Sequence, residues 1–261
     1  MPPDLDLLRT RRAIVVAAHP DDETAGAGAL LAELADPLVV HATDGSPANP
    51  ADARAAGCAT AAEYAAVRRA ELLAALRLAG IGPQRAREIG FRDQEASLRM
   101  AELARILCAL FEETRPAAVL THPYEGGHPD HDAAAFGVHA ACALMESPPG
   151  IFEFACYHGL RGWMQPGAFL PGGPEPLEIA LSEAARARRS AMLECFVTQR
   201  ETLRIFDSGV ERFRAAPRCC FTMPPHTGLL NYERYDWGMT GARFRALARE
   251  ALAGLGLEDG L

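Results

Sequence analysis

The chain has 261 residues, of which 49% are hydrophobic and 23% are charged, and its formal net charge is −8. These fractions are ordinary for a folded protein, and the acidic balance argues against a nucleic-acid-binding protein, which would show a basic patch or stripe. All 26 basic residues are arginine, which excludes mechanisms that need a catalytic lysine.

Three features predict where the protein resides. The longest apolar stretches, such as 133–145, are shorter than the roughly 20 residues that span a bilayer. The first residues carry acidic and arginine side chains where a signal peptide would have its hydrophobic segment. The seven cysteines form no C-x-x-C pair and are odd in number, which is typical of reduced thiols. We therefore expect a cytoplasmic protein without a membrane span.

Apolar runs and amphipathic segments alternate along the first half of the chain. The predicted strands are 13–18, 38–42, 87–91 and 117–121, and the predicted helices are 24–34, 60–79, 100–111 and 132–145. A loop is expected at 43–57, which is rich in Gly, Pro, Asp and Asn. Four strand–helix repeats predict a Rossmann-like, three-layer α/β sandwich with a mostly parallel sheet.

The pattern loosens after residue 148. Strands are predicted at 151–157 and 177–181, helices at 183–196, 198–206 and 241–252, and an irregular aromatic segment at 218–236. No low-complexity linker interrupts the chain. We therefore expect a single domain over 1–261, with a motif-bearing α/β core at about 12–147 and a C-terminal elaboration at about 148–261.

Chemically reactive side chains concentrate in two segments. AHPDDE at 18–23 follows the first predicted strand, and HPDHD at 128–132 follows the strand at 117–121. Ligands gather outside the carboxyl ends of strands where the strand order reverses, so both segments should face one crevice. Two imidazoles and one carboxylate are a common ligand set for catalytic zinc, with the fourth position open to water. Spacing alone leaves open which aspartate and which histidine of each motif bind the metal.

The two motifs resemble those of the PIG-L/LmbE family of zinc-dependent N-acetylglucosaminyl deacetylases. AHPDDE and HPDH occur in the family's order, and the resemblance extends to Arg68-x-x-Glu71 and to Thr198-Gln199, where the family has Ser-Gln. Without the resemblance, Arg68 and Glu71 are equally well interpreted as a surface ion pair. The resemblance implies hydrolysis of an N-acetyl amide by a metal site that holds zinc, with iron(II) as the alternative metal.

The resemblance also implies a role for each matching residue. The metal ligands are His19, Asp22 and His131. Asp21 is the general base, His128 stabilises or protonates the tetrahedral intermediate, and Asp130 orients His128. The substrate-binding residues are Arg68 and Asp44.

These roles predict a hydrolase that removes an N-acetyl group from a 2-acetamido sugar or glycoconjugate, a small-molecule partner. One alternative is an amidase that cleaves a larger acyl or thiol-conjugate amide with the same site. A second is a catalytically inactive, metal-binding relative, which the presence of Asp21 and His128 disfavours because metal binding needs neither. A homo-oligomeric state is left open.

Two weaker signals have competing interpretations. The segment at 224–237 contains two tyrosines and a tryptophan, and it is either a packed cap over the sheet or a wall of the substrate pocket, which Trp163 could also line. His122 is expected either to lie behind the metal ligands or to be an ordinary core residue.

Overall fold

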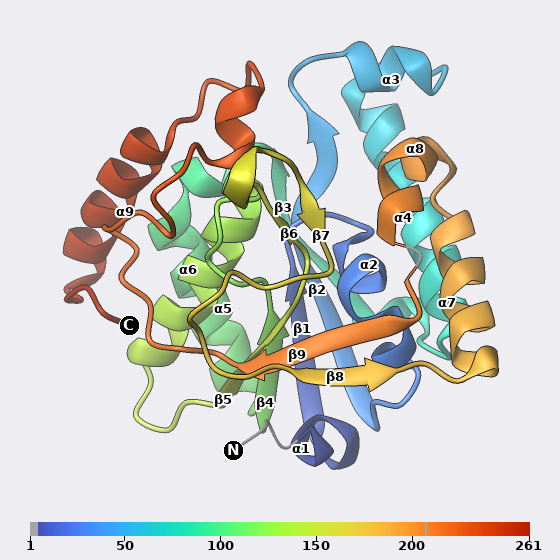
Figure 1. Cartoon of the computed structure of the whole chain (residues 1–261), viewed down its shortest axis with the longest axis horizontal. Helices are drawn as coiled ribbons and strands as arrows, with labels where there is room; N and C mark the ends of the chain where they lie inside the picture. The colour runs from blue at the N-terminus through green and yellow to red at the C-terminus, as the bar shows by residue number, and fades with distance from the viewer. Residues whose placement is uncertain (1–4, 207) are drawn as a thin grey trace.

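The computed structural model describes residues 5–206 and 208–261, which form a seven-stranded sheet in the order β3-β2-β1-β4-β5-β9-β8 (Figure 1). The strands of this sheet are β1 Arg12–Ala17, β2 Asp36–Pro47, β3 Ala86–Asp93, β4 Ala118–Thr121, β5 Gly150–Phe154, β8 Leu177–Ala180 and β9 Val210–Ala215. The strands from β3 to β5 are parallel, whereas β9 pairs antiparallel with both β5 and β8. Two further short strands, β6 Tyr157–His158 and β7 Gln165–Pro166, pair with each other.

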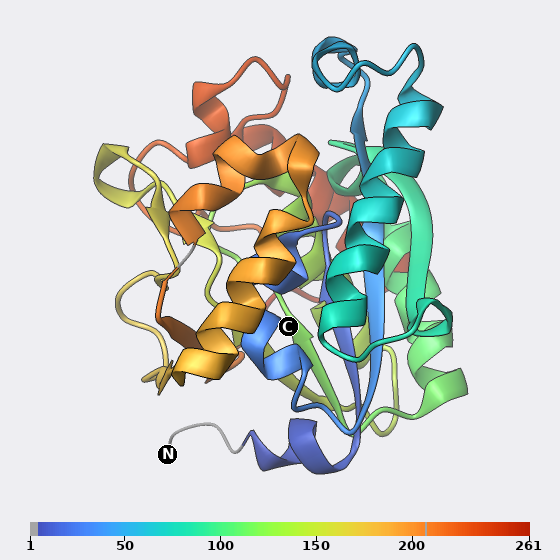
Figure 2. The same ribbon diagram turned by 90° about the vertical axis from the view of Figure 1, so that its right-hand side faces the viewer.

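Helices cover both faces of the sheet. Figure 1 shows α5, α6 and α9 on one face and α2, α4 and α7 on the other, and Figure 2 shows α4 and α7 in front of the strands. The described helices are α1 Asp6–Thr10, α2 Asp22–Leu31, α3 Ala51–Ala55, α4 Ala61–Leu78, α5 Met100–Thr114, α6 Pro129–Ala143, α7 Glu183–Glu194, α8 Arg200–Leu203 and α9 Gly241–Leu255. Within the described parts of the chain, no helix has both the length and the apolar character needed to cross a membrane.

The position of β1 inside the sheet explains why most of its sequence is an unbroken apolar run. Ile14 and Val16 pack into the core beneath α5, α6 and α9, whereas Ala13 and Val15 pack into the core beneath α2, α4 and α7. Strands that are buried on both faces read as continuous hydrophobic runs rather than as alternating ones. The predicted three-layer α/β fold is confirmed.

The structure differs from the predicted elements in several places. The expected loop at 43–57 contains the short helix α3, and the strand predicted at 151–157 is divided into β5 and β6. β2 continues to Pro47, into the expected loop at 43–57, because its end pairs with β3 through shifts in register. The segment at 198–206 is a short helix, α8, between two 3₁₀ turns rather than one helix. β9 was not predicted, because its sequence VERFRA buries two charged side chains, Glu211 and Arg214, and so lacks an apolar signal.

Candidate metal centre and catalytic cavity

The two motif segments meet because β1 and β4 are neighbours in the sheet. Their register pairs Val16 with Thr121 near the carboxyl ends of both strands, after which the chain enters AHPDDE on one side and the segment leading to HPDHD on the other. β2 and β5 lie on the outer sides of this pair, so the strand order reverses between β1 and β4, where ligands bind in open α/β sheets. A cavity of about 310 Å³ lies here, with residues of both motifs in its lining.

The turn after β1 holds Asp21 in a strained backbone conformation. Asp21 has a φ of 148°, a region that residues other than glycine rarely adopt and that costs about 1–3 kcal/mol. Its N–H donates to the buried carboxylate of Glu23 (3.1 Å), which also contacts Nε2 of His41 on β2 (3.0 Å). Its carbonyl accepts from two backbone N–H groups of α2. These contacts determine the turn and thereby fix the side chain of Asp21.

Three histidines and one aspartate converge in the cavity. Ligand atoms of His19, His128 and His131 lie within 4.8 Å of one another. Asp22 contacts two of them, with its Oδ2 3.1 Å from His19 Nδ1 and its Oδ1 3.1 Å from His131 Nε2. All four side chains are buried. His19, Asp22 and His131, which the family resemblance assigns to the metal, therefore lie together, with Asp22 in contact with both histidines.

Carboxylates dominate the electrostatics around His19. Its Nε2 lies 3.0 Å from Asp93 Oδ1 and 3.5 Å from Asp130 Oδ2. Burial alone would lower the pKa of His19, but the charges of Asp93 and Asp22 outweigh it and raise that pKa well above its usual value. Burial likewise would raise the pKa of Asp22, but the histidines around it hold that pKa well below its usual value. The cluster therefore attracts positive charge.

Two atoms at the centre of this cluster lack hydrogen bonds. His19 Nε2 and Asp93 Oδ1 have no hydrogen-bond partner among the described residues, although they are only 3.0 Å apart. A ring nitrogen and a carboxylate oxygen at this distance, with no hydrogen bond between them, are arranged as two ligands of one cation are. Imidazole and carboxylate are typical zinc ligands. The residues present therefore fit a divalent metal ion.

Asp21 is paired with Arg68 of α4 rather than with the metal-type cluster. The Arg68 guanidinium donates from Nη2 to Asp21 Oδ2 (3.0 Å) and to the Pro20 carbonyl (2.7 Å), and it is buried. Burial raises the pKa of Asp21 to about 7, against the opposing charge of Arg68. Glu71 accepts hydrogen bonds from the backbone and hydroxyl of Thr198. The interpretation of Arg68 and Glu71 as a surface ion pair is therefore wrong.

His128 is oriented by the start of α6. It precedes Pro129 with φ −134° and ψ 143°, the extended conformation that a following proline favours. Its Nδ1 accepts from the Asp130 N–H (3.1 Å), so the neutral ring carries its proton on Nε2. Burial and the neighbouring His19 hold the pKa of His128 well below its usual value. His128 therefore offers an Nε2–H donor in the cavity lining.

The carboxylate of Asp130 is placed differently from its expected role. It accepts from the backbone N–H groups of Gln94 (2.6 Å) and Ser97 (3.3 Å), and it approaches His19. Only the backbone N–H of Asp130 has a hydrogen bond to His128 among the described contacts. Asp130 thus links the start of α6 to the segment after β3, and it orients His128 through its main chain.

Asp44 also has a different place from the one expected of a substrate-binding residue. Its Oδ1 accepts from the N–H of Ser46 (2.8 Å) and weakly from that of Asp93 (3.4 Å). Gly45, the next residue, is part of the cavity lining, whereas Asp44 is not. The carboxylate therefore holds the ends of β2 and β3 together.

Two residues at the cluster, Asp93 and Cys156, were not predicted from the sequence. Asp93 ends β3, two residues beyond the strand predicted at 87–91, and the rule on carboxyl ends of strands could have found it. Cys156 follows β5, and its Sγ lies 4.0 Å from Asp22 Oδ1. A lone cysteine in an unremarkable sequence context gives no such signal.

Both interpretations of the segment at 224–237 hold for different residues. Tyr232 is fully buried in the core. Trp237 lines the cavity, and its ring lies 4.7 Å from that of His128 and stacks on Tyr235 at 4.4 Å. Trp163 is 61% exposed and is not part of the lining.

His122 lies behind the metal-type residues. It is fully buried, its Nε2 accepts from the Ala18 N–H (3.1 Å), and its ring stacks on that of His131 at 4.0 Å. Burial lowers its pKa to about 3. A neutral His122 therefore supports the ring of His131 from the side of β4.

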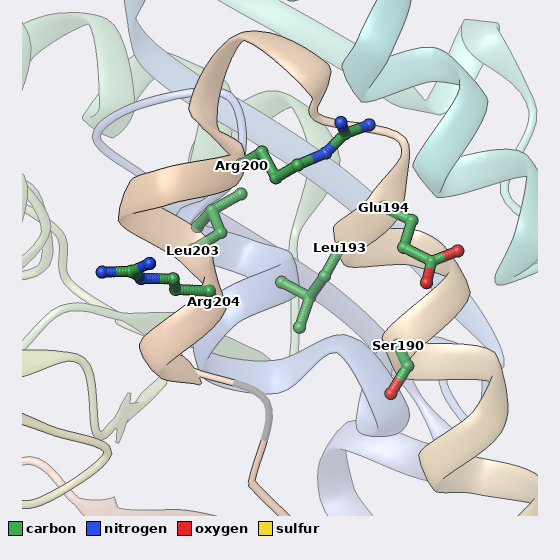
Figure 3. A pocket seen from close by; sticks show the side chains of 6 residues that line it. All are labelled: Ser190, Leu193, Glu194, Arg200, Leu203 and Arg204. Atoms are coloured by element: carbon green, nitrogen blue, oxygen red, sulfur yellow. The ribbon is translucent and has the colours of Figure 1, made fainter.

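A second cavity of about 290 Å³ lies between α7 and α8 (Figure 3). Leu203 is part of the lining of both cavities. In Figure 3 the side chain of Arg204 points away from Leu193 and Glu194 of α7. Among the described residues, the lining of this second cavity lacks the converging titratable groups that mark the first one, which is therefore the candidate active site.

Comparison with known proteins identifies a family for the motif-bearing part. Residues 14–142 match the family model described as PIG-L, GlcNAc-PI de-N-acetylase. A 1D-myo-inositol 2-acetamido-2-deoxy-alpha-D-glucopyranoside deacetylase from Mycobacterium sp. (strain KMS) is 35% identical over 142 residues, 46% of this chain and 46% of the relative. The chain thus spans about half the length of the curated relatives it matches.

Solved structures share the fold over most of the chain. The deacetylase of the antimicrobial A40926 pseudoaglycone superposes with a TM-score of 0.63 at 23% identity, covering 79% of this chain and 97% of that one. A 4-carboxy-2-hydroxymuconate hydratase, GalB of Pseudomonas putida KT2440, superposes with a TM-score of 0.55 at 18% identity, covering 80% and 98%. Because the same fold occurs in a deacetylase and in a hydratase, function has to be argued from the site.

Proposed function

Residues 14–142 of this protein match the PIG-L family model, and on that premise we propose that it is a zinc-dependent hydrolase that removes the acetyl group from a 2-acetamido sugar or glycoconjugate. The observation that carries the proposal is the convergence of His19, Asp22 and His131 beside Asp21 and His128 in one cavity. Metal binding alone would need only the first three.

His19, Asp22 and His131 would hold the metal, and Asp93 lies close enough to His19 to assist them. When bound, zinc supplies a Lewis acid for the amide carbonyl and lowers the pKa of water to about 7. His122 and Cys156, behind His131 and Asp22, keep this pair of ligands in place.

Asp21 is the base that takes the proton of the attacking water. Its carboxylate lines the cavity, its backbone is fixed by the turn after β1, and Arg68 holds one of its oxygens. A positioned base of this kind contributes roughly 10²–10⁴-fold to the rate. Arg68 therefore acts on catalysis through Asp21, in addition to its place in the cavity lining.

His128 stabilises the oxygen that becomes negative as the amide is attacked. Its proton is on Nε2, because Nδ1 accepts from the Asp130 N–H. A preorganised donor at that oxygen is worth about 10²–10³-fold in other acyl-transfer sites. The proton that Asp21 takes from the attacking water is then available for the departing amine, while the neutral ring of His128 keeps its Nε2 proton and acts as a hydrogen-bond donor.

The substrate class comes from the relatives and suits the size of the cavity. The curated relatives are deacetylases of a 2-acetamido-2-deoxy-glucopyranoside, and a cavity of about 310 Å³ is near the lower end of the usual range for small-molecule pockets. Trp237 provides an aromatic surface in the lining against which a sugar face can pack. The larger-acyl amidase is the rival activity, and an inactive metal-binding protein is the rival without turnover.

The test is a deacetylation screen with two neighbouring variants. Wild-type protein loaded with zinc should release acetate from N-acetylglucosamine derivatives. Asp21→Asn should retain zinc but lose about 10²–10⁴-fold in kcat, because the amide cannot accept the proton of water. Asp22→Asn should lose zinc affinity as well, because Asp22 contacts both His19 and His131.

Three results would contradict parts of the proposal. Release of a longer acyl group but not of acetate would favour the amidase. Zinc binding without hydrolysis of any amide would favour the inactive relative. Loss of zinc in Asp21→Asn with its retention in Asp22→Asn would exchange the roles of base and ligand.

A further inference from the structure

A second group of metal-type side chains lies away from the cavity. Ligand atoms of His139, Glu153 and Cys219 lie within 4.8 Å of one another. His139 is on α6, eight residues and so about 12 Å along the helix axis beyond His131. Glu153 is on β5, and Cys219 is in the segment that follows β9. None of these residues belongs to the lining of the candidate active site.

Two of the three side chains are buried with unused ligand atoms. His139 Nε2 and Glu153 Oε1 have no hydrogen-bond partner within the part of the chain that the structure describes, and the two residues are 5% and 0% exposed. An unsatisfied buried polar group costs about 1–3 kcal/mol, and each such group needs an explanation. Here both unsatisfied groups belong to residues clustered with one thiol.

The surroundings of the cluster favour a cation. Burial and the nearby carboxylates Glu153, Asp132 and Glu125 together raise the pKa of the Cys219 thiol to about 12, against the charge of Arg214. Burial lowers the pKa of His139 to about 4, which keeps its imidazole neutral and able to act as a ligand. Arg214 donates from Nε to the second oxygen of Glu153 (2.5 Å), which leaves Oε1 for another partner.

We propose that His139, Glu153 and Cys219 bind a structural zinc ion, distinct from the catalytic metal. Nitrogen, oxygen and thiolate ligands together select zinc over magnesium or calcium, which prefer oxygen alone. The Cys219 thiol would lose its proton to solvent as the thiolate–metal bond forms, and all three side chains offer atoms of ligand type for zinc. The ion would tie the segment around Cys219 to α6 and β5, and so join the C-terminal part of the chain to the motif-bearing part.

Zinc stoichiometry tests the site once the first site has been removed. His19→Ala/His131→Ala breaks every donor set that the structure places around the cavity, so this double variant should retain one zinc per chain. Adding Cys219→Ser should reduce that to none. Adding Cys142→Ser, a buried thiol of α6 outside the cluster, is the matched control and should leave the single zinc in place. A double variant that holds no zinc would overturn the proposal.

A second measurement covers the case in which the triple variant fails to fold. Zinc X-ray absorption on Cys156→Ser, which removes the thiol near the catalytic metal, should show a sulfur neighbour at about 2.3 Å. A zinc environment of nitrogen and oxygen alone in a protein with two bound ions would overturn the site. Neither measurement depends on turnover, so failure of the proposed activity would leave this result unaffected.

Discussion

Helix α6 carries two histidines with opposite surroundings. His131, in its first turn, lines the cavity, where it contacts Asp22 and stacks on His122. His139, about two turns further on, lies in the core against Phe221, and burial lowers its pKa to about 4. Both are nearly fully buried, at 3% and 5% exposed. The extent of burial therefore does not distinguish the two histidines. They differ because His131 lines a cavity that also contains several carboxylates, whereas His139 does not.

Replacing each of these two histidines by alanine tests the difference between them and should give the largest effect. His131→Ala should abolish turnover and strip the catalytic metal, because three protein ligands leave no redundancy. His139→Ala should keep the metal at the first site and lower the free energy of unfolding by about 0.5–3 kcal/mol, the usual range for a destabilising substitution.

The measurements are zinc content, acetate release and denaturant unfolding for wild type, His131→Ala and His139→Ala. A His131→Ala variant that keeps its turnover would place the catalytic metal elsewhere. If His139→Ala emptied the first site as well, the two histidines would belong to one functional unit.

The two clusters also differ in how far sequence could predict them. The ligands at the cavity come from short motifs, each directly after a strand or at the start of a helix, so residue type and the order of the strands place them together. His139, Glu153 and Cys219 come from three elements that are far apart in sequence. Nothing local marks Glu153 on β5 or Cys219, and only the antiparallel pairing of the unpredicted β9 with β5 brings them near.

Within the cavity, prediction succeeded where a residue's position in an element decides its direction. The proline after His128 predicts an extended backbone, which the structure confirms. Prediction failed for carboxylates that can either face the cavity or accept hydrogen bonds from nearby backbone N–H groups. Asp44 and Asp130 both satisfy main-chain donors of neighbouring segments, and such a choice depends on loop geometry that periodicity does not describe.

The variant His128→Ala tests whether His128 is a metal ligand or a hydrogen-bond donor in the cavity. It should bind zinc normally and lower kcat by about 10²–10⁴, the range for loss of a positioned acid or oxyanion donor. The readouts are kcat and zinc content, with His131→Ala as the contrasting variant. Loss of zinc would instead make His128 a ligand, because its ring nitrogen lies within 4.8 Å of the ligand atoms of His19 and His131.

On the core side, Glu125 provides a test by pH. Burial raises its pKa to about 8, against the charge of Arg214 and with Glu153 and Asp132 adding to the rise. Because the folded protein holds this proton more tightly than the unfolded chain does, the stability it contributes is present at pH 4 and is lost as the pH rises through 8.

Glu125→Gln removes this ionisation and keeps an oxygen that can accept from the Leu170 N–H. The stability of the variant relative to wild type should therefore rise between pH 5 and 9 by several kcal/mol, because each pKa unit of the shift to about 8 is worth roughly 1.4 kcal/mol. Denaturant unfolding at both pH values measures the difference. A constant difference across this range would mean that Glu125 stays charged beside Arg214.

The smallest expected effect concerns Trp237, at the wall of the cavity. Its ring lines the cavity, lies 4.7 Å from His128 and is supported by Tyr235, so it can pack against a sugar without taking part in proton transfer. An aromatic contact of this kind is worth about 0.5–1.5 kcal/mol, and its loss in Trp237→Leu should raise KM up to about tenfold with little change in kcat. Trp163→Leu, which removes a tryptophan that is 61% exposed and outside the lining, is the matched control and should leave KM unchanged. A fall in kcat without a change in KM would show instead that Trp237 acts by positioning the ring of His128.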